Sequence, residues 1–308
     1  MRIHLDTDLG GDPDDVCALA LLLGWPDVEL VGITTTSAKS ALRAGMVEYV
    51  FRLARRSGVA VAAGADGSLS GYRMAAQFPD LAQHWPEGVT ARPSPPGAAL
   101  NLLAESIEVG ATVVAIGPYT NLALLEGMRP GTLAAANLVT MGGSIRPMPP
   151  GLPPWGPDDD YNLYQDATAT RILFECGSPL VVPMEVTAQV TLRRSQLPWL
   201  RTSGPLGELI ARQSELEASG GLGAMGREYP GLPDDLLNFQ HDPLACAVAA
   251  GWDGVTVEEI PLSLSMDDGL PRLSLHPGGK LIRVVTGVES AAFDEAWRSA
   301  VERAGTVG

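Results

Sequence analysis

Five aspartates crowd one short turn near the start of the chain. The segment Asp6–Asp15 reads DTDLGGDPDD and lies between a short apolar run and a helical one. Two carboxylates about 5 Å apart repel each other by roughly 3 kcal/mol at an effective dielectric constant of 20. A helix cap, with Asp12 as N-cap and Pro13 in the first helical position, would use two or three of these acids and not five. Clustered carboxylates suit Ca²⁺ or Mg²⁺ better than zinc, so the turn predicts a metal site.

The rest of the chain predicts an α/β fold that would hold this turn at the edge of a sheet. Apolar runs of strand length alternate with helical segments, which is typical of a mostly parallel central sheet flanked by helices. In such sheets ligands bind beyond the carboxyl ends of the strands. The segment 255–285 predicts added C-terminal antiparallel strands, and we expect one domain over residues 1–308. The predicted parallel strands are Ile3–Asp6, Val28–Thr35, Val59–Ala62, Thr112–Ile116, Asn137–Met141 and Leu180–Val186.

Composition narrows the class of protein. The 308 residues are 45% hydrophobic and 19% charged, which allows a large core and excludes a disordered chain. A formal net charge of −15 argues against nucleic-acid and anionic-membrane partners. Cys17, Cys176 and Cys246 lie on apolar, helix-like segments without a CxxC pattern, which predicts reduced, buried thiols. With no signal-like N-terminus and no apolar stretch long enough for a membrane, these features predict a cytoplasmic enzyme.

The acidic turn resembles the DxDxGxDD turn of the nucleoside hydrolase family, the inosine–uridine-preferring glycosidases. Six further motifs resemble those of the family and follow in its order, so the resemblance covers nearly the whole chain. It implies the family's fold, hydrolysis of a small ribonucleoside to base and ribose, and a homodimer or homotetramer. These motifs are Val31–Thr35, Ala62–Asp66, Ala115–Asn121, Met141–Gly143, Asp160–Asn162 and His241–Pro243.

The resemblance also implies a Ca²⁺ site and a mechanism. Asp8, Asp15 and Asp242 match the family's side-chain ligands, and Ile116 stands where the family uses a backbone carbonyl. Asp14 matches the general base, which would deprotonate a metal-bound water for direct attack on the sugar. Such an attack suits an oxocarbenium-like transition state stabilised by surrounding negative charge.

Substrate contacts follow from the same resemblance. Asn162 and Asp160 match residues that hold the ribose hydroxyls, and His241 matches a residue beside the leaving base, which it could protonate. Trp155 offers an aromatic face for stacking on a base. His84 lies in a long loop where the family often has a pocket histidine, although a surface histidine is the alternative there.

Three departures from the family pattern leave parts of this assignment open. The turn is two residues longer than the common spacing, so Asp12 is a second candidate for a ligand position. Lys39 stands where an asparagine usually contacts the sugar, and an ammonium there would meet an acidic substrate group or solvent. The loop before Asp160 (Pro153–Pro157) lacks the asparagine expected near the 5′-hydroxyl.

Two other classes of function remain open on the sequence alone. A binding protein of the same fold, without turnover or with an altered substrate, would account for Lys39 and the missing asparagine. A haloacid dehalogenase-like phosphatase would use Asp6 and Asp8 at the end of the first strand. That chemistry also needs Thr or Val where Gly10 stands, together with a lysine in the site.

Overall fold

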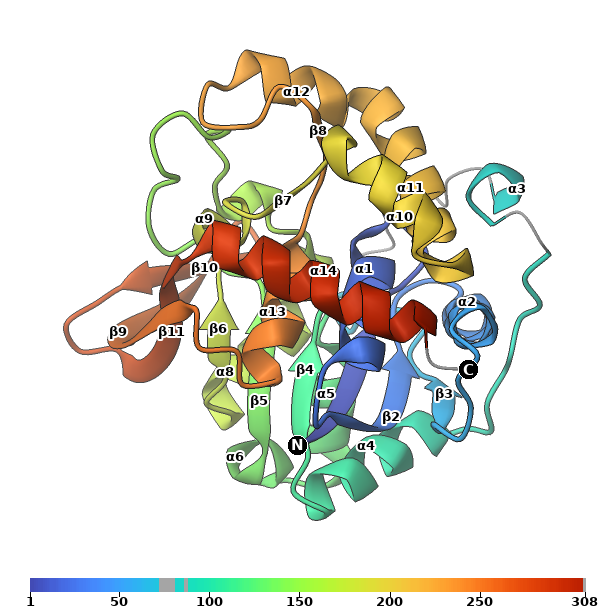
Figure 1. Ribbon diagram of the computed structural model, residues 1–308. Helices are drawn as coiled ribbons and strands as arrows, with labels where there is room; N and C mark the ends of the chain where they lie inside the picture. Colours follow the sequence, from blue (N-terminus) through green and yellow to red (C-terminus); the bar gives the residue numbers. More distant parts are fainter. Residues whose placement is uncertain (72–80, 86–87, 307–308) are drawn as a thin grey trace.

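The computed structural model describes residues 1–71, 81–85 and 88–306. It contains a nine-stranded sheet whose order is β10-β9-β11-β6-β5-β4-β1-β2-β3, together with a small antiparallel sheet of β7 and β8 (Figure 1). The six strands β1 to β6 run parallel, as predicted. The strands are β1 (Arg2–Thr7), β2 (Glu29–Thr35), β3 (Val61–Ala63), β4 (Thr112–Ala115), β5 (Asn137–Met141), β6 (Leu180–Val182), β7 (Thr191–Arg193), β8 (Leu236–Phe239), β9 (Val255–Asp267), β10 (Leu270–Leu275) and β11 (Lys280–Val288).

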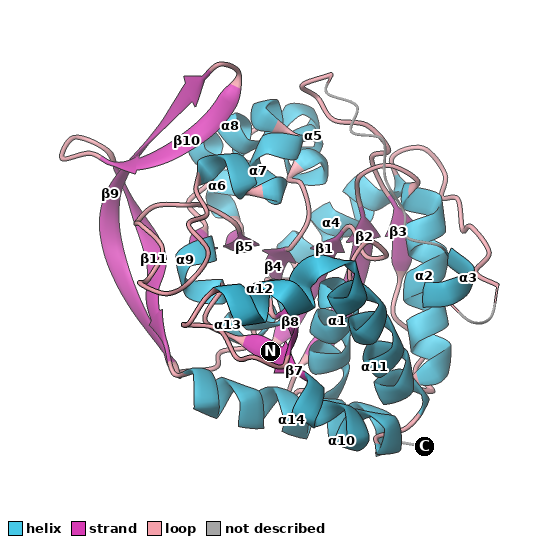
Figure 2. Cartoon of the chain, turned by 90° about the horizontal axis from the view of Figure 1, so that it is seen from above, coloured by secondary structure: helices cyan, strands magenta, loops and turns pink. Residues whose placement is uncertain are grey.

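Helices cover both faces of the parallel part of the sheet. Figure 2 shows α1, α13 and α14 on one face and α4, α5 and α8 on the other. Each layer has its own apolar core, which agrees with a sheet buried on both sides. The helices are α1 (Asp14–Gly24), α2 (Ser40–Leu53), α3 (Leu81–His84), α4 (Ala98–Glu108), α5 (Thr120–Met128), α6 (Thr132–Ala135), α7 (Tyr161–Gln165), α8 (Ala167–Cys176), α9 (Met184–Thr187), α10 (Leu197–Thr202), α11 (Pro205–Glu217), α12 (Gly223–Glu228), α13 (His241–Ala249) and α14 (Ser290–Thr306).

The first helix is enclosed almost all round, which explains its nearly continuous apolar sequence. It lies between the sheet, α13 and α14, and ten of its eleven residues are buried. Trp297 of α14 is fully buried and donates a hydrogen bond from its indole N–H to the carbonyl of Cys17 at 3.2 Å. The C-terminal helix therefore clamps the helix that carries Asp14 and Asp15.

Most predicted elements are confirmed, with two differences. The strand expected over Leu180–Val186 ends at Val182, because Pro183 has no N–H for a ladder and the chain then turns into α9. The added strands β9, β10 and β11 are present; β11 is antiparallel to β9 but parallel to β6, so it extends the main sheet. No helix in the described ranges is both long and apolar enough to cross a bilayer.

A buried polar chain lies beneath the acidic turn, on the central strand β1. Nε2 of His4 lies 3.0 Å from Oγ1 of Thr34, and Nδ1 lies 2.8 Å from Oγ of Ser106. Thr34 and Asn121 donate hydrogen bonds to Oδ1 of Asp6, whose pKa burial raises to about 7. Thr34 uses its proton on Asp6, so it accepts from Nε2–H of His4. These bonds fix the end of β1 where the aspartates begin.

His4 predicts a specific acid sensitivity of the fold. Burial lowers its pKa from 6.5 to about 3, so between these values the unfolded chain binds a proton that the native chain does not. The contribution of His4 to the free energy of unfolding therefore falls as pH falls, by about 2 kcal/mol at about pH 5. Buried carboxyl groups with raised pKa values shift stability in the opposite direction, so the comparison is made between two proteins that share them. From about pH 7.5 to about pH 5, urea unfolding should show a change about 2 kcal/mol less favourable in the wild type than in His4→Gln. An equal change in both proteins would contradict the assignment.

Candidate active site

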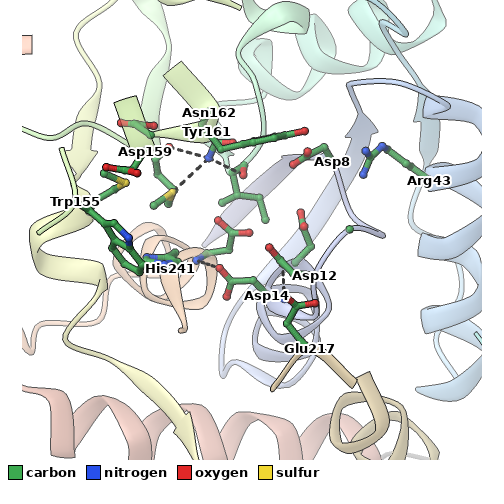
Figure 3. A pocket seen from close by; sticks show the side chains of 17 residues that line it. Asp8, Asp12, Asp14, Arg43, Trp155, Asp159, Tyr161, Asn162, Glu217 and His241 are labelled. Atoms are coloured by element: carbon green, nitrogen blue, oxygen red, sulfur yellow. Dashed lines mark hydrogen bonds between the residues drawn. The ribbon is translucent and has the colours of Figure 1, made fainter. Parts of the chain in front are cut away.

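A cavity of about 670 Å³ opens at the carboxyl ends of the parallel strands (Figure 3). Its volume lies in the range of small-molecule sites. All of the predicted site residues except Lys39 and His84 line it. The predicted residues that do so are Asp8, Asp12, Asp14, Asp15, Ile116, Trp155, Asp160, Asn162, His241 and Asp242.

Local hydrogen bonds shape the acidic turn. Oγ1 of Thr7 donates to Asp15 and accepts from the backbone N–H of Leu9 at 3.1 Å, and the N–H of Asp14 reaches Oδ1 of Asp12 at 3.0 Å. Helix α1 begins at Asp14, and Pro13 just before it already has helical φ and ψ, −77° and −4°. The bond from the N–H of Asp14 to Asp12 is the side-chain contact of a capping residue, so Asp12 caps this helix, although the helix begins one residue later than predicted. Asp12 is exposed at the cavity wall, two residues before the buried Asp14.

Asp14 and Asp242 connect the first helix to α13. The backbone N–H of Asp242 donates to Oδ2 of Asp14 at 3.1 Å, whereas Oδ1 of Asp14 is buried and has no partner among the described residues. Because α13 begins at His241 after Gln240, Asp242 lies inside the helix and does not act as its N-cap. Burial raises the pKa of Asp14, and repulsion from Asp12 and Asp15 raises it further.

The pKa values of the other acids are raised for the same reasons. Burial raises the pKa of Asp15, with repulsion from Asp8 next, and raises the pKa of Asp242, with repulsion from Asp14 next. Desolvation also raises the pKa of Asp8, to about 6, although the Arg43 guanidinium opposes this shift. A cation at this place would relieve the repulsion that these carboxylates share.

The described residues do not form a closed metal-binding set. Within them, no three His, Cys, Asp or Glu side chains have the spacing of ligands around one ion. The donor chemistry nevertheless fits a hard divalent cation, because carboxylates crowd here and Oδ1 of Asp14 is unpaired within the described chain. The carbonyl of Ile116, the predicted backbone ligand, accepts from Nδ2 of Asn162 at 3.0 Å and keeps one lone pair.

Asp160 and Asn162 are held rigidly by backbone groups. Asp160 is the N-cap of α7: one carboxylate oxygen accepts from the N–H of Leu163 at 3.2 Å and the other from Gly143. Nδ2 of Asn162 donates to the carbonyls of Ile116 and Met141, at 3.0 and 3.2 Å. Oδ1 of Asn162 remains as an acceptor on a side chain that lines the cavity.

Trp155 and His241 line the cavity, and Phe239 packs against both rings. The rings of Trp155 and Phe239 lie 4.9 Å apart, and Phe239 stacks on His241 with centroids 5.3 Å apart at 25°. Nδ1 of His241 lies 2.7 Å from Oγ1 of Thr187, and burial lowers the pKa of His241 to about 4. A planar heterocycle fits beside such rings.

The structure places Lys39 and His84 outside the residues that line this cavity. Lys39 is exposed at the start of α2 with φ of 62°, and the cation that lines the cavity is Arg43, one turn further on. His84 is buried on α3, so the surface alternative is wrong, and its carbonyl accepts from Nε2 of Gln213 at 3.1 Å.

Arg43 and Glu217 are cavity residues that the sequence did not single out. Arg43 lies one helical turn after Lys39, the residue that replaces the family's asparagine. Residues four apart share a helix face, so this spacing is the sequence signal that could have pointed to Arg43. Glu217 ends α11, and nothing in its local pattern pointed to a site.

Comparisons with known proteins decide the family. Residues 3–295 match the sequence pattern of the family described as inosine-uridine preferring nucleoside hydrolase. The chain belongs to this family. The pyrimidine-specific ribonucleoside hydrolase RihA of Salmonella agona (strain SL483) is 30% identical over 226 residues, which cover 68% of this chain and 69% of that protein.

Solved nucleoside hydrolases share the fold. The purine-preferring ribonucleoside hydrolase from Gardnerella vaginalis has a TM-score of 0.80 at 21% identity, with 100% of both chains covered. The plant nucleoside hydrolase PpNRh1 has a TM-score of 0.81 at 20% identity, covering 97% of this chain and 98% of that one. Nucleoside hydrolases cleave the N-glycosidic bond of ribonucleosides, and membership of this family replaces the phosphatase hypothesis.

The bonds of Asn162 predict a structural role in addition to any ligand contact. In Asn162→Ala the carbonyls of Ile116 and Met141 lose a buried donor, so the free energy of unfolding should fall by about 1–3 kcal/mol. Denaturant unfolding measures this change, with Asn101→Ala on the exposed side of α4 as the control. If the two variants were equally stable, the amide would not be holding these carbonyls.

Proposed function

We propose that this nucleoside hydrolase is Ca²⁺-dependent and uses Asp14 as the general base in a direct attack of water on the ribose. The observation that carries the proposal is the buried Oδ1 of Asp14, which has no partner among the described residues and borders the cavity. The other oxygen of the same carboxylate is fixed by the N–H of Asp242. One oxygen thus orients the group while the other is available to take a proton.

The metal would be held by oxygen donors on three parts of the chain. Asp8 and Asp15 come from the acidic turn, Asp242 from α13, and the Ile116 carbonyl from the end of β4. Asp12, at the wall of the same cavity, is the alternative donor from the turn. A bound Ca²⁺ would lower the pKa of a water molecule and would orient the ribose hydroxyls.

The chain's own residues supply the remaining steps. Asp14 takes the proton of the attacking water as the bond to the base breaks. The surrounding carboxylates stabilise the positive charge that develops on the sugar. Asn162 and Asp160 position the ribose, while Trp155 and His241 hold the base. Thr187 engages Nδ1 of His241, so we assign Nε2 as the ring nitrogen that faces the leaving base and can protonate it.

The assignment of Asp14 is tested by separating turnover from metal affinity. Asp14→Asn keeps an oxygen acceptor for the N–H of Asp242, so the protein should fold normally and bind Ca²⁺. Turnover should fall at least about 100-fold, as expected when a general base is lost. Calorimetric Ca²⁺ titration and base-release kinetics give the two readings for each variant.

Matched variants make this test decisive. Asp8→Asn, Asp15→Asn and Asp12→Asn are compared in the same two assays, and the first two should weaken Ca²⁺ binding. If Asp14→Asn instead lost the metal, while Asp8→Asn or Asp12→Asn bound it without turnover, the base would have to be reassigned to that residue.

Metal dependence predicts a joint loss of activity and stability on chelation. A ligand that binds only the native state raises the free energy of unfolding, by about 2.7 kcal/mol at a hundredfold excess over its Kd. EDTA should therefore lower both the Tm and the release of base and ribose from a panel of nucleosides, and added Ca²⁺ should restore both. Full activity in EDTA, with an unchanged Tm, would contradict the metal site.

A further inference from the structure

Arg43 places a positive charge in a cavity that is lined mainly by acids. Among the described residues that line it, eight carry a carboxylate, and Arg43 is the one lysine or arginine. Arg43 is only 4% exposed, although burial strips a guanidinium of its hydration. The proposed mechanism gives this charge no role. The eight acids are Asp8, Asp12, Asp14, Asp15, Asp159, Asp160, Glu217 and Asp242.

The start of α2 holds the guanidinium of Arg43 at the acidic turn. Nε of Arg43 donates to the carbonyl of Ala38 at 3.0 Å, in the segment just before the helix. Figure 3 shows the guanidinium beside Asp8, with its nitrogens toward the acids. Burial raises the pKa values of Asp8, Asp12 and Asp15, and the guanidinium opposes each of these shifts. Its charge therefore acts on carboxylates that the proposed metal site would use.

A fixed positive charge at this place has opposite effects on the metal-free and the metal-bound protein. Without a metal it attracts the carboxylates and offsets part of their mutual repulsion. It repels a divalent cation that the same carboxylates bind. At an effective dielectric constant of 20, a unit charge and a divalent ion about 10 Å apart repel strongly enough to change a Kd more than a hundredfold. Water and salt in an open cavity screen part of this repulsion.

We propose that Arg43 is a built-in counter-charge for Asp8, Asp12 and Asp15, which stabilises the metal-free protein and weakens its affinity for Ca²⁺. This inference rests on the proposed metal dependence and goes beyond it, because it assigns the strength of metal binding to a residue that is not a ligand. The same carboxylates would bind Ca²⁺ more tightly without this charge. Occupancy of the site therefore responds to Ca²⁺ over a higher range of concentration.

Three variants separate the charge of Arg43 from its contacts. Arg43→Met removes the charge together with the bond to Ala38, whereas Arg43→Lys keeps the charge and loses the Nε–H that makes this bond. Arg52→Met changes the net charge equally at an exposed position of the same helix. If Arg43→Met does not fold in EDTA, Arg43→Gln, which keeps a donor for the carbonyl of Ala38, takes its place.

Calorimetric Ca²⁺ titration and thermal unfolding in EDTA give the two readings. The titrations are made at about pH 9, where fewer protons compete with Ca²⁺ for the carboxylates. The Kd of Arg43→Met should be at least about tenfold lower than that of the wild type, while Arg43→Lys and Arg52→Met should stay close to the wild type. In EDTA, the Tm of Arg43→Met should lie below that of Arg43→Lys.

The outcomes distinguish this inference from the proposed metal dependence. Ca²⁺ binding by the neutral variant but not by the wild type supports the inference, although it contradicts the metal dependence of the wild type. An equal or weaker affinity in the neutral variant, or an equal Tm of the two Arg43 variants in EDTA, overturns the inference and leaves the metal dependence intact. Absence of Ca²⁺ binding in every protein overturns both.

Discussion

Repulsion among buried carboxylates is the constraint around which this molecule is arranged. Asp14, Asp15 and Asp242 are each only 5% exposed, and burial followed by repulsion from neighbouring acids raises the pKa of each, so both effects oppose ionisation of the cluster. A fold tolerates such a cluster only if rigid neighbours hold it in place. Here the sheet edge, the buried helix α1 and the start of α13 do so, and each contributes acids to the same cavity.

The other residues that line the cavity fall into two chemical groups, polar side chains and aromatic rings. Polar groups anchored by backbone bonds come from the segment after β5, and the aromatic side chains Trp155 and His241 line the same cavity with Phe239 packed against both. In the proposed reaction the polar groups hold the sugar and the aromatic rings hold the base. Two groups break this pattern: Arg43 opposes the charge of Asp8 from α2, and Glu217 adds a carboxylate from α11. Arg43 comes from α2, which packs on β2 and β3, whereas Glu217 comes from α11, which packs on other helices and on β8.

The sequence predicts the parallel sheet and the position of the cavity well, because the patterns that indicate them lie within short segments or follow a fixed order along the chain. Continuous apolar runs identify the parallel strands, and the aspartate turn identifies the edge where the cavity lies. Lys39 and His84 were assigned to the substrate from their place in the sequence, but left-handed backbone at Lys39 and packing of α3 on α11 place them elsewhere. Asp6 belongs to the same acidic turn but is a buried hydrogen-bond acceptor beneath it, a distinction that only the contacts with Thr34 and Asn121 reveal. Glu217 reaches the cavity through long-range packing, which no local pattern encodes.

The clamp of α14 on α1 has a consequence for how the protein is made. The helix with Asp14 and Asp15 is translated long before its buried partners, because α13 and Trp297 come more than two hundred residues later in the chain. During that interval an almost wholly apolar helix and its acids lack their native cover. Contacts of such high sequence separation form late and leave nascent chains open to misassembly. Asp14 and Asp242 therefore cannot come together before α13 has been translated, and α1 gains its full cover only when α14 has followed.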